Sequence, residues 1–135
     1  MIIVACVEDR NGMLFNKRRV SRDIVVCQDV LNTCPTRLWM NSYSAPLFAD
    51  LPQRKIQVAE DFLRQAEAGQ WCFVENVALP EASDEIEQVI LYRWNQKYPA
   101  DTYFDVDLAD WQLLSTTELA GHSHGKISKE VYGRR

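Results

Sequence analysis

The sequence lacks three patterns that would point directly to a class of function. It contains no C-x-x-C pair, and its two histidines lie far along the chain from its four cysteines, so the usual spacing of a metal site is absent. No apolar run reaches the roughly 18 residues that a membrane-spanning helix needs. The 15 lysines and arginines are outnumbered by 19 acidic residues, which argues against a surface that binds a nucleic-acid duplex. We therefore expect no metal, no membrane contact and no nucleic-acid partner.

The chain also lacks the features of a secreted protein. Its cysteines each lie in an apolar run, as small hydrophobic residues do, and we expect reduced, buried thiols at Cys6, Cys27, Cys34 and Cys72. The sequence opens directly with a strand-like run and not with a basic region followed by an apolar stretch and a cleavage site. These observations predict a cytoplasmic protein.

The composition is that of one globular domain. The 135 residues are 47% hydrophobic and 25% charged, which suffices for a real core, and no repeat or linker divides the chain. We therefore expect a single domain over residues 1–135.

The order of apolar patterns predicts an α/β fold in three layers, with a mixed central β-sheet, flanking helices and an antiparallel C-terminal hairpin. Residues 2–7 form an apolar, β-branched run that is typical of a buried strand. The other expected elements are a helix that starts at Arg22 with Ser21 as its cap and ends before Pro35, a strand over 38–40, a helix from Val58 closed by Gly69, strands over 71–74 and 89–94, and hairpin arms over 111–119 and 127–132.

Several motifs support a family resemblance. They are MIIVACVEDRNGM at residues 1–13, LPQRK at 51–55, VILYRW at 89–94 and ADTYF at 100–104. In this order and spacing they resemble the dihydrofolate reductase family over the length of the chain. The chain looks like a divergent, shortened member, about a strand and its loops short. The deletion falls after Lys55, where residues 56–57 lead almost directly into the helix expected from Val58.

The resemblance implies a role for Asp23, which falls where the family has an acidic side chain that binds the pterin ring and assists its protonation. On a helix, Asp23 shares a face with Cys27, Val30 and Cys34, an apolar wall that would favour the neutral carboxyl form. The same wall makes Cys27 a candidate for contact with a substrate. An aspartate in the first turn of a helix also serves the helix dipole and the unpaired N–H groups there, and both interpretations stay open.

The resemblance implies three further substrate-binding residues. Arg54, within LPQRK, matches an arginine that holds the glutamate tail carboxylate of folate, a task suited to a planar bidentate group. Phe48 and Leu51 lie where the family lines its folate pocket. A surface arginine and two core residues are the alternative interpretation.

The elements with which this family binds NADPH are missing. Its Gly-Gly pair, where backbone N–H groups approach the pyrophosphate, is replaced by Val74-Glu75-Asn76-Val77. Its Gly-Arg-x-Thr is replaced by Met40-Asn41-Ser42-Tyr43, and the Pro-Trp of its active-site loop by Lys17-Arg18. We expect no cofactor at all; NADPH is expected only if the protein has remained a reductase.

Two polar clusters remain. Lys17, Arg18, Arg19 and Arg22 are four charges in six residues, a pattern that is more often a solvated loop than a site. With Arg54 they would make a pocket near Asp23 attractive to an anion. The loop at 121–126 holds both histidines, for which a solvated hairpin loop is the default and a metal site a weak alternative.

Three functions are consistent with these patterns. The first is a dihydrofolate reductase-like protein that does not reduce dihydrofolate and binds or senses a small anionic molecule. The second is an NAD(P)H-dependent reductase of a folate, pterin or related substrate, with Asp23 as proton relay. The third is a homodimeric interaction protein whose cleft is filled by side chains.

Overall fold

The computed structural model describes residues 1–79 and 84–135. Its elements are β1 (Ile2–Val7), β2 (Gly12–Phe15), β3 (Arg18–Arg19), α1 (Ile24–Thr33), β4 (Leu38–Met40), η1 (Ala45–Phe48), β5 (Ile56–Val58), α2 (Phe62–Gln65), β6 (Trp71–Phe73), β7 (Gln88–Arg93), β8 (Thr102–Tyr103), η2 (Leu108–Asp110), β9 (Trp111–Leu119) and β10 (Ile127–Arg134). Within the described part of the chain, no helix is long and apolar enough to cross a membrane.

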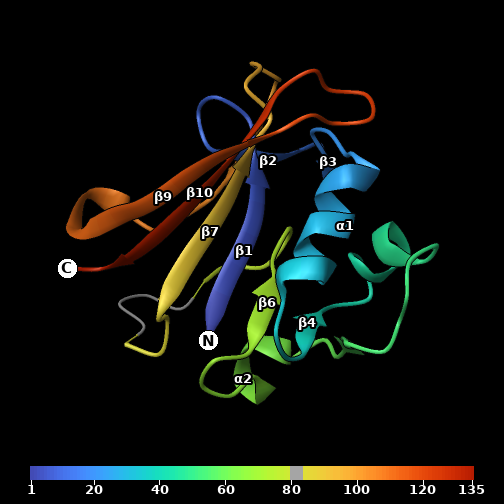
Figure 1. Ribbon diagram of the computed structural model, residues 1–135, viewed down its shortest axis with the longest axis vertical. Helices are drawn as coiled ribbons and strands as arrows, with labels where there is room; N and C mark the ends of the chain where they lie inside the picture. Colours follow the sequence, from blue (N-terminus) through green and yellow to red (C-terminus); the bar gives the residue numbers. More distant parts are fainter. Residues whose placement is uncertain (80–83) are drawn as a thin grey trace.

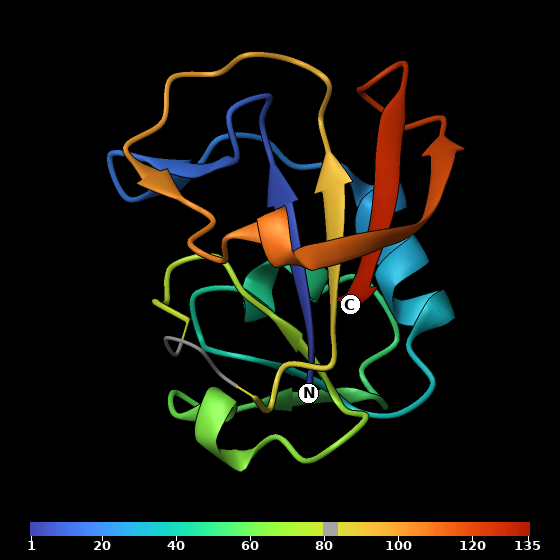
Figure 2. The same cartoon turned by 90° about the vertical axis from the view of Figure 1, so that its left-hand side faces the viewer.

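A seven-stranded mixed sheet organises the molecule, in the order β5-β4-β6-β1-β7-β10-β9. The apolar run over residues 2–7 lies where its sequence predicts, since β1 is parallel to both β6 and β7 in the middle of the sheet. Strand β10 is antiparallel to β7 and to β9, so the predicted hairpin is confirmed and makes the sheet mixed. Figure 2 shows β1 and β7 side by side in one direction, with β10 running the opposite way.

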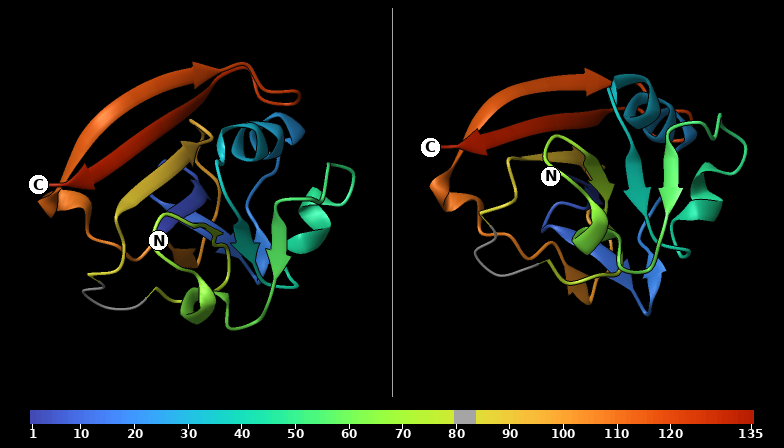
Figure 3. Two further views of the ribbon diagram at one scale, coloured as in Figure 1. Left: turned by 60° about the horizontal axis from the view of Figure 1, so that its bottom comes forward. Right: turned by 90° about the horizontal axis from the view of Figure 1, so that it is seen from below.

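Both faces of the sheet are covered. Successive side chains of β1 point to opposite faces of the sheet, and because they are apolar, each face needs a layer that packs on it. Val4 points to one face and packs with Val26 and Val30 of α1. Ile3 points to the other face, in a cluster that includes Phe62 of α2 and Leu14 of β2. Figure 3 shows α1 on one side of the sheet, beside the end of the β9–β10 hairpin. The predicted three-layer α/β arrangement is therefore present.

Helix α1 begins two residues later than the sequence predicts. Its N-cap is Asp23, in an extended conformation, and the Asp23 side chain accepts a hydrogen bond from the backbone N–H of Val25. Ser21 contacts His124 instead, so it does not cap the helix. Serine and aspartate are equally good caps. Because Ser21 is bound to His124, which is distant in the sequence, Asp23 is the residue that caps the helix.

The helix predicted from Val58 to Gly69 is wrong over most of its length. Residues Ile56–Val58 form β5, which pairs in parallel with β4 so that Met40 lies opposite Val58. Only Phe62–Gln65 are helical, and Phe62 is buried against the sheet. The strand that the resemblance left out after Lys55 is thus present, because pairing with β4 outweighs the helical spacing of the apolar residues.

A smaller three-stranded sheet, in the order β3-β2-β8, holds the basic cluster. Strands β2 and β3 are joined by a tight turn in which Asn16 and Lys17 have positive φ angles of 50° and 65°. Figure 1 shows β3 leading to the N-terminal end of α1, with the loop between β9 and β10 reaching over the same end. Residues from both ends of the sequence therefore meet there.

Candidate functional site

The carboxylate of Asp23 is enclosed by hydrogen-bond donors from the loop between β9 and β10. Its Oδ1 accepts from the backbone N–H groups of Val25 at 3.0 Å and His122 at 2.9 Å. Its Oδ2 accepts from the backbone N–H groups of Ser123 at 2.9 Å and His124 at 3.2 Å, and from the Ser123 hydroxyl at 3.2 Å. The Asp23 side chain is 0% exposed. The loop thus supplies a ready-made nest for one negative charge.

This environment overturns the expectation of a neutral carboxyl group. Burial acts to raise the pKa of Asp23, but the hydrogen bonds from His122, His124, Ser123 and Val25 outweigh it and hold the pKa well below its usual range. A carboxylate that binds its donors so strongly is a poor source of protons near neutral pH. The geometry therefore makes Asp23 a fixed anion and does not favour it as a proton relay.

His124 connects Asp23 to Ser21. Its Nδ1 lies 2.9 Å from Oδ2 of Asp23, and its Nε2 lies 2.8 Å from Oγ of Ser21. Because an ionised carboxylate only accepts hydrogen bonds, we assign a proton to Nδ1, and in this tautomer Nε2 is the acceptor for the Ser21 hydroxyl. The ring stacks on Trp94, with centroids 4.6 Å apart and planes 29° apart. The imidazole is therefore held at both nitrogens and over its face.

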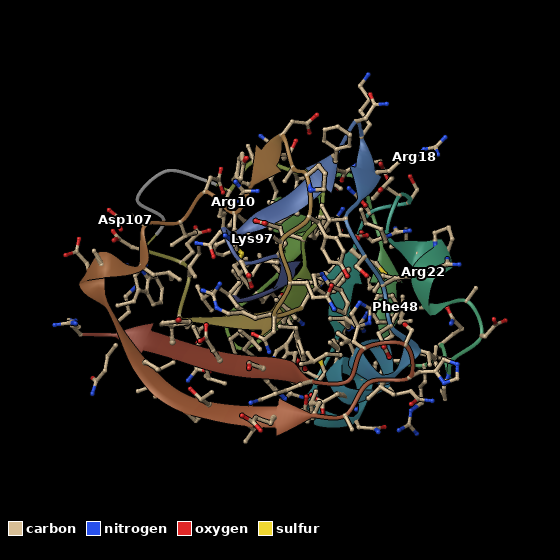
Figure 4. All side chains as sticks on the ribbon, turned by 90° about the horizontal axis from the view of Figure 1, so that it is seen from above. Arg10, Arg18, Arg22, Phe48, Lys97 and Asp107 are labelled. Carbon is tan, nitrogen blue, oxygen red and sulfur yellow. The ribbon has the colours of Figure 1, made fainter. Side chains whose placement is uncertain are left out.

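An open cavity of about 840 Å³ lies beside this cluster, and we call it the basic cavity. Its lining residues are Lys17, Arg18, Arg19, Ser21, Arg22, Tyr43, Ser123 and His124. Four of them are cationic and none is acidic. Figure 4 shows Arg18 and Arg22 on the same side of the molecule, away from Asp107. The predicted basic cluster is therefore the wall of a cavity that also exposes Ser21 and His124.

One of these cations is neutralised by a buried partner. Arg19 donates two hydrogen bonds to Glu75, from Nε at 2.8 Å and from Nη2 at 3.0 Å, and its guanidinium lies over the Tyr43 ring. The hydroxyl of Ser44 also donates to Glu75, at 2.8 Å. Glu75 belongs to the segment that replaces the Gly-Gly pair in the family resemblance. The Glu75 carboxylate is therefore buried and paired with Arg19, so it does not carry an unpaired negative charge.

The same edge of the sheet is bridged a second time, between the segments that follow β4 and β6. The amide of Asn41 donates to Oδ1 of Asn76 at 2.7 Å, and Oδ1 of Asn41 accepts from the backbone N–H of Ser44. Asn41 lies in the segment that replaces Gly-Arg-x-Thr. Side chains thus connect the two places where the resemblance puts NADPH contacts.

Arg54 and Leu51 line a different cavity, of about 590 Å³, with Gln28, Leu31, Asn32, Pro52 and Lys55. The structure therefore brings both residues together, beside α1. The ammonium of Lys55 donates to the carbonyl oxygens of Leu31 and Cys34 at the end of α1, at 2.7 and 2.6 Å. Arg54 is exposed. Because the Lys55 ammonium is bound to these carbonyl oxygens, Arg54 is the cation of this cavity that can bind an acidic group.

The other two candidate substrate contacts have different environments. Phe48 is 0% exposed and packs edge-on against Phe73, with ring centroids 5.1 Å apart, so it is a core residue and cannot touch a substrate in this conformation. Cys27 lines a cavity of about 320 Å³ together with Asp23 and His122. Burial raises the pKa of the Cys27 thiol to about 12, so its surface there is neutral.

No local pattern in the sequence indicates the burial of His124. The sequence predicts a solvated loop at 121–126, yet His124 is only 7% exposed. Its partners Asp23 and Ser21 are 101 and 103 positions away, and no local pattern reports such a contact. The glycine at position 121 is consistent with this contact, because a Cβ there would lie 2.6 Å from Oδ2 of Asp23.

Comparison with solved structures decides the fold. The chain superposes on dihydrofolate reductase from Enterococcus faecalis, in its complex with NADP(H) and RAB-propyl, with a TM-score of 0.67 at 9% sequence identity, over 100% of this chain and 96% of that chain. The chain has a dihydrofolate reductase-like fold. The sequence itself matches no protein family model and no curated protein. At this level of identity the dihydrofolate reductase-like fold is shared, and function depends on the site.

Proposed function

We propose that the protein binds a small anionic molecule in the basic cavity and does not catalyse NADPH-dependent reduction of dihydrofolate. The observation that supports binding is the charge of the wall, where Lys17, Arg18 and Arg22 lie beside Arg19, whose own charge is paired with Glu75. Within residues 1–79 and 84–135, no carboxylate forms an ion pair with Lys17, Arg18 or Arg22. Such a wall attracts anions, and guanidinium groups suit phosphates and carboxylates.

The obstruction of the cofactor groove supports the loss of the reductase activity. The segments that replace the family's glycines carry here the side chains of the Arg19–Glu75 pair and the Asn41–Asn76 bridge. Opening the groove would leave a buried carboxylate without its partner, which costs several kcal/mol in typical proteins. Asp23, enclosed by donors, is also poorly suited to deliver a proton.

The direct test is a binding screen with a matched control. We expect pyrophosphate, a nucleoside triphosphate or a tricarboxylate to raise the melting temperature, because a ligand that prefers the folded state stabilises it by mass action. The Arg18→Gln/Arg22→Gln variant should lose the shift. Arg64→Gln removes an exposed positive charge from α2 and should keep it.

The same screen tests the competing reductase hypothesis. NADPH and dihydrofolate are added together, and the absorbance of NADPH is followed. Turnover that depends on Asp23 would contradict the proposal and establish an NAD(P)H-dependent reductase. If neither the anions nor NADPH raises the melting temperature, the proposal is also contradicted, because the basic cavity would then bind no ligand of the proposed class.

A second candidate function is self-association through the sheet edge. Within the described part of the chain β9 pairs only with β10, and its adjacent leucines Leu113 and Leu114 are 48% and 51% exposed. A long exposed edge of this kind is a template for pairing with a second copy of the chain. Size-exclusion chromatography with light scattering should give a dimer if this holds, and Leu114→Lys should convert it to a monomer.

We also propose a cytoplasmic location. The thiols of Cys6, Cys27, Cys34 and Cys72 are all unpaired, and reduced cysteines are typical of a reducing compartment. Cell fractionation with a tagged full-length chain tests this expectation.

A further inference from the structure

Three side chains beside the basic cavity have the connectivity of an activated nucleophile. The Ser21 hydroxyl lies 2.8 Å from Nε2 of His124, and Nδ1 of the same ring lies 2.9 Å from the Asp23 carboxylate. Serine, imidazole and carboxylate in this order let the ring accept the hydroxyl proton while the carboxylate orients the ring. The order along the chain is Ser21, Asp23, His124, and such arrangements are recognised by geometry and not by order.

The carboxylate of Asp23 and the ring of His124, which orient the Ser21 hydroxyl, are both held rigidly. Asp23 is fixed by four backbone N–H groups, which leaves its carboxylate ionised and unable to rotate away from the ring. Stacking on Trp94 fixes the plane of the imidazole. His124 and Asp23 are buried, with side chains 7% and 0% exposed. A nucleophile supported in this way needs little reorganisation before it reacts.

The hydroxyl is also accessible. Ser21 is partly exposed and lines the basic cavity together with His124. Arg18 and Arg22 line the same cavity, and within the described chain neither guanidinium has an ion-pair partner. A bound molecule would therefore meet the Ser21 hydroxyl and positive charge at the same time.

We propose that Ser21 is a catalytic nucleophile, with His124 as its general base and Asp23 as the positioning carboxylate, and that the protein hydrolyses carboxylic esters carrying a nearby carboxylate or phosphate. The preference for a charged ester rests on the proposed function of the basic cavity. The nucleophile itself does not depend on it.

The reaction balances with water as the second reactant. Ser21 Oγ forms a bond to the ester carbonyl carbon while its proton moves to Nε2 of His124. The bond from that carbon to the alkoxy oxygen then breaks, and the leaving alcohol takes the proton from Nε2. Water attacks the resulting acyl-serine, gives its proton to Nε2, and the acid is released as Ser21 recovers that proton.

The first experiment uses a neutral fluorophosphonate, whose phosphorus bonds to an activated serine oxygen as fluoride leaves. The intact protein is treated, and the modified residue is located by peptide mass spectrometry. We expect modification at Ser21, none in Ser21→Ala, and a rate at least about 100-fold lower in His124→Gln. Ser115→Ala, which removes an exposed hydroxyl on β9, is the matched control and should react like the unmodified protein. Circular dichroism shows which variants remain folded.

The second experiment compares hydrolysis of 4-nitrophenyl hemisuccinate with that of neutral 4-nitrophenyl acetate. We expect a higher kcat/KM for the anionic ester, and loss of that preference in Arg18→Gln/Arg22→Gln. Modification of Ser21 without an anion preference would support the nucleophile and contradict the proposed anion cavity. Anion binding with no modification of Ser21 in the folded protein would overturn the nucleophile and leave the proposed function standing.

Discussion

Arg19 and Glu75 are joined by two hydrogen bonds, of 2.8 Å from Nε to Oε2 and 3.0 Å from Nη2 to Oε1. Their side chains are only 22% and 9% exposed, so the pair ties β3 to the end of β6 in a partly desolvated environment. A planar guanidinium that binds a carboxylate in this bidentate way is both directional and charge-assisted. The pair therefore fixes the position of the basic cluster.

A double-mutant cycle with Arg19→Met and Glu75→Gln should give a coupling free energy of about 1–3 kcal/mol in urea unfolding. The exposed pair Lys126–Glu118, with side chains 63% and 62% exposed, is the control. Its coupling should stay below about 1 kcal/mol, because solvent screens surface pairs. Equal couplings for the two pairs would show that the Arg19–Glu75 contact does not hold β3 in solution.

Gly121→Ala should destabilise the protein by about 1–3 kcal/mol. A Cβ at this position would lie 2.6 Å from Oδ2 of Asp23 and 2.7 Å from the carbonyl oxygen of His124, so the loop must move off the carboxylate. Thermal unfolding measures the loss.

Gly125→Ala is the control in the same loop, because nothing lies within 4 Å of its added Cβ. Its effect should stay within about 0.5 kcal/mol. If Gly121→Ala is equally harmless, the close approach of the loop to Asp23 is not present in solution.

Asp23→Asn should cost about 3 kcal/mol at pH 7, because an amide cannot accept from every donor that surrounds the carboxylate. The pKa of Asp23 is lowered on folding, so its charge stabilises the fold above the unfolded pKa of about 4, and this contribution is lost as the pH falls. The difference between the unmodified protein and the variant should therefore shrink below about pH 4, by up to about 1.4 kcal/mol per pH unit.

The control for Asp23 is Asp107→Asn. Asp107 is an exposed cap of η2 that accepts from the backbone N–H of Ala109, and asparagine replaces it well. Urea unfolding at several pH values measures both variants. A constant loss for Asp23→Asn across this range would mean that the carboxylate is not held as an anion.

Tyr92→Phe should cost about 1–2 kcal/mol. The Tyr92 hydroxyl donates to Oδ2 of Asp29 at 2.6 Å, and the side chain is 0% exposed. Tyr103→Phe is the control: its hydroxyl also bonds, to the carbonyl of Ala100 at 2.9 Å, but the residue is 47% exposed. Its loss should stay below about 0.5 kcal/mol, and similar losses for both would contradict the importance of burial.

The sheet could be predicted because its signals are local. Residues 2–7 are all apolar and mostly β-branched, and a strand buried on both faces needs this composition. The hairpin arms predicted over 111–119 and 127–132 likewise follow from their own residues, and the structure extends the second arm to Arg134. Motif order then indicated the dihydrofolate reductase-like fold that the structural comparison confirms.

The remaining elements depend on partners that are distant in the sequence. The spacing of the apolar residues after Val58 predicts a helix that begins there, but pairing with Met40 makes Val58 part of a strand. Phe48 and Leu51 are similar in character and close together, and only the packed structure shows that Phe48 faces Phe73. The state of Asp23 depended on donors 99 to 101 positions away.

The separation between Asp23 and its donors sets an order of events during synthesis. Synthesis proceeds from the N-terminus at about 5–20 residues per second. Helix α1 can form early with only Val25 as a donor to its cap, because residues 122 to 124 have not yet been made. Ser21, His124 and the basic cavity wall are assembled only when the loop after β9 is complete. The carboxylate of Asp23 therefore gains most of its donors only in the last part of synthesis.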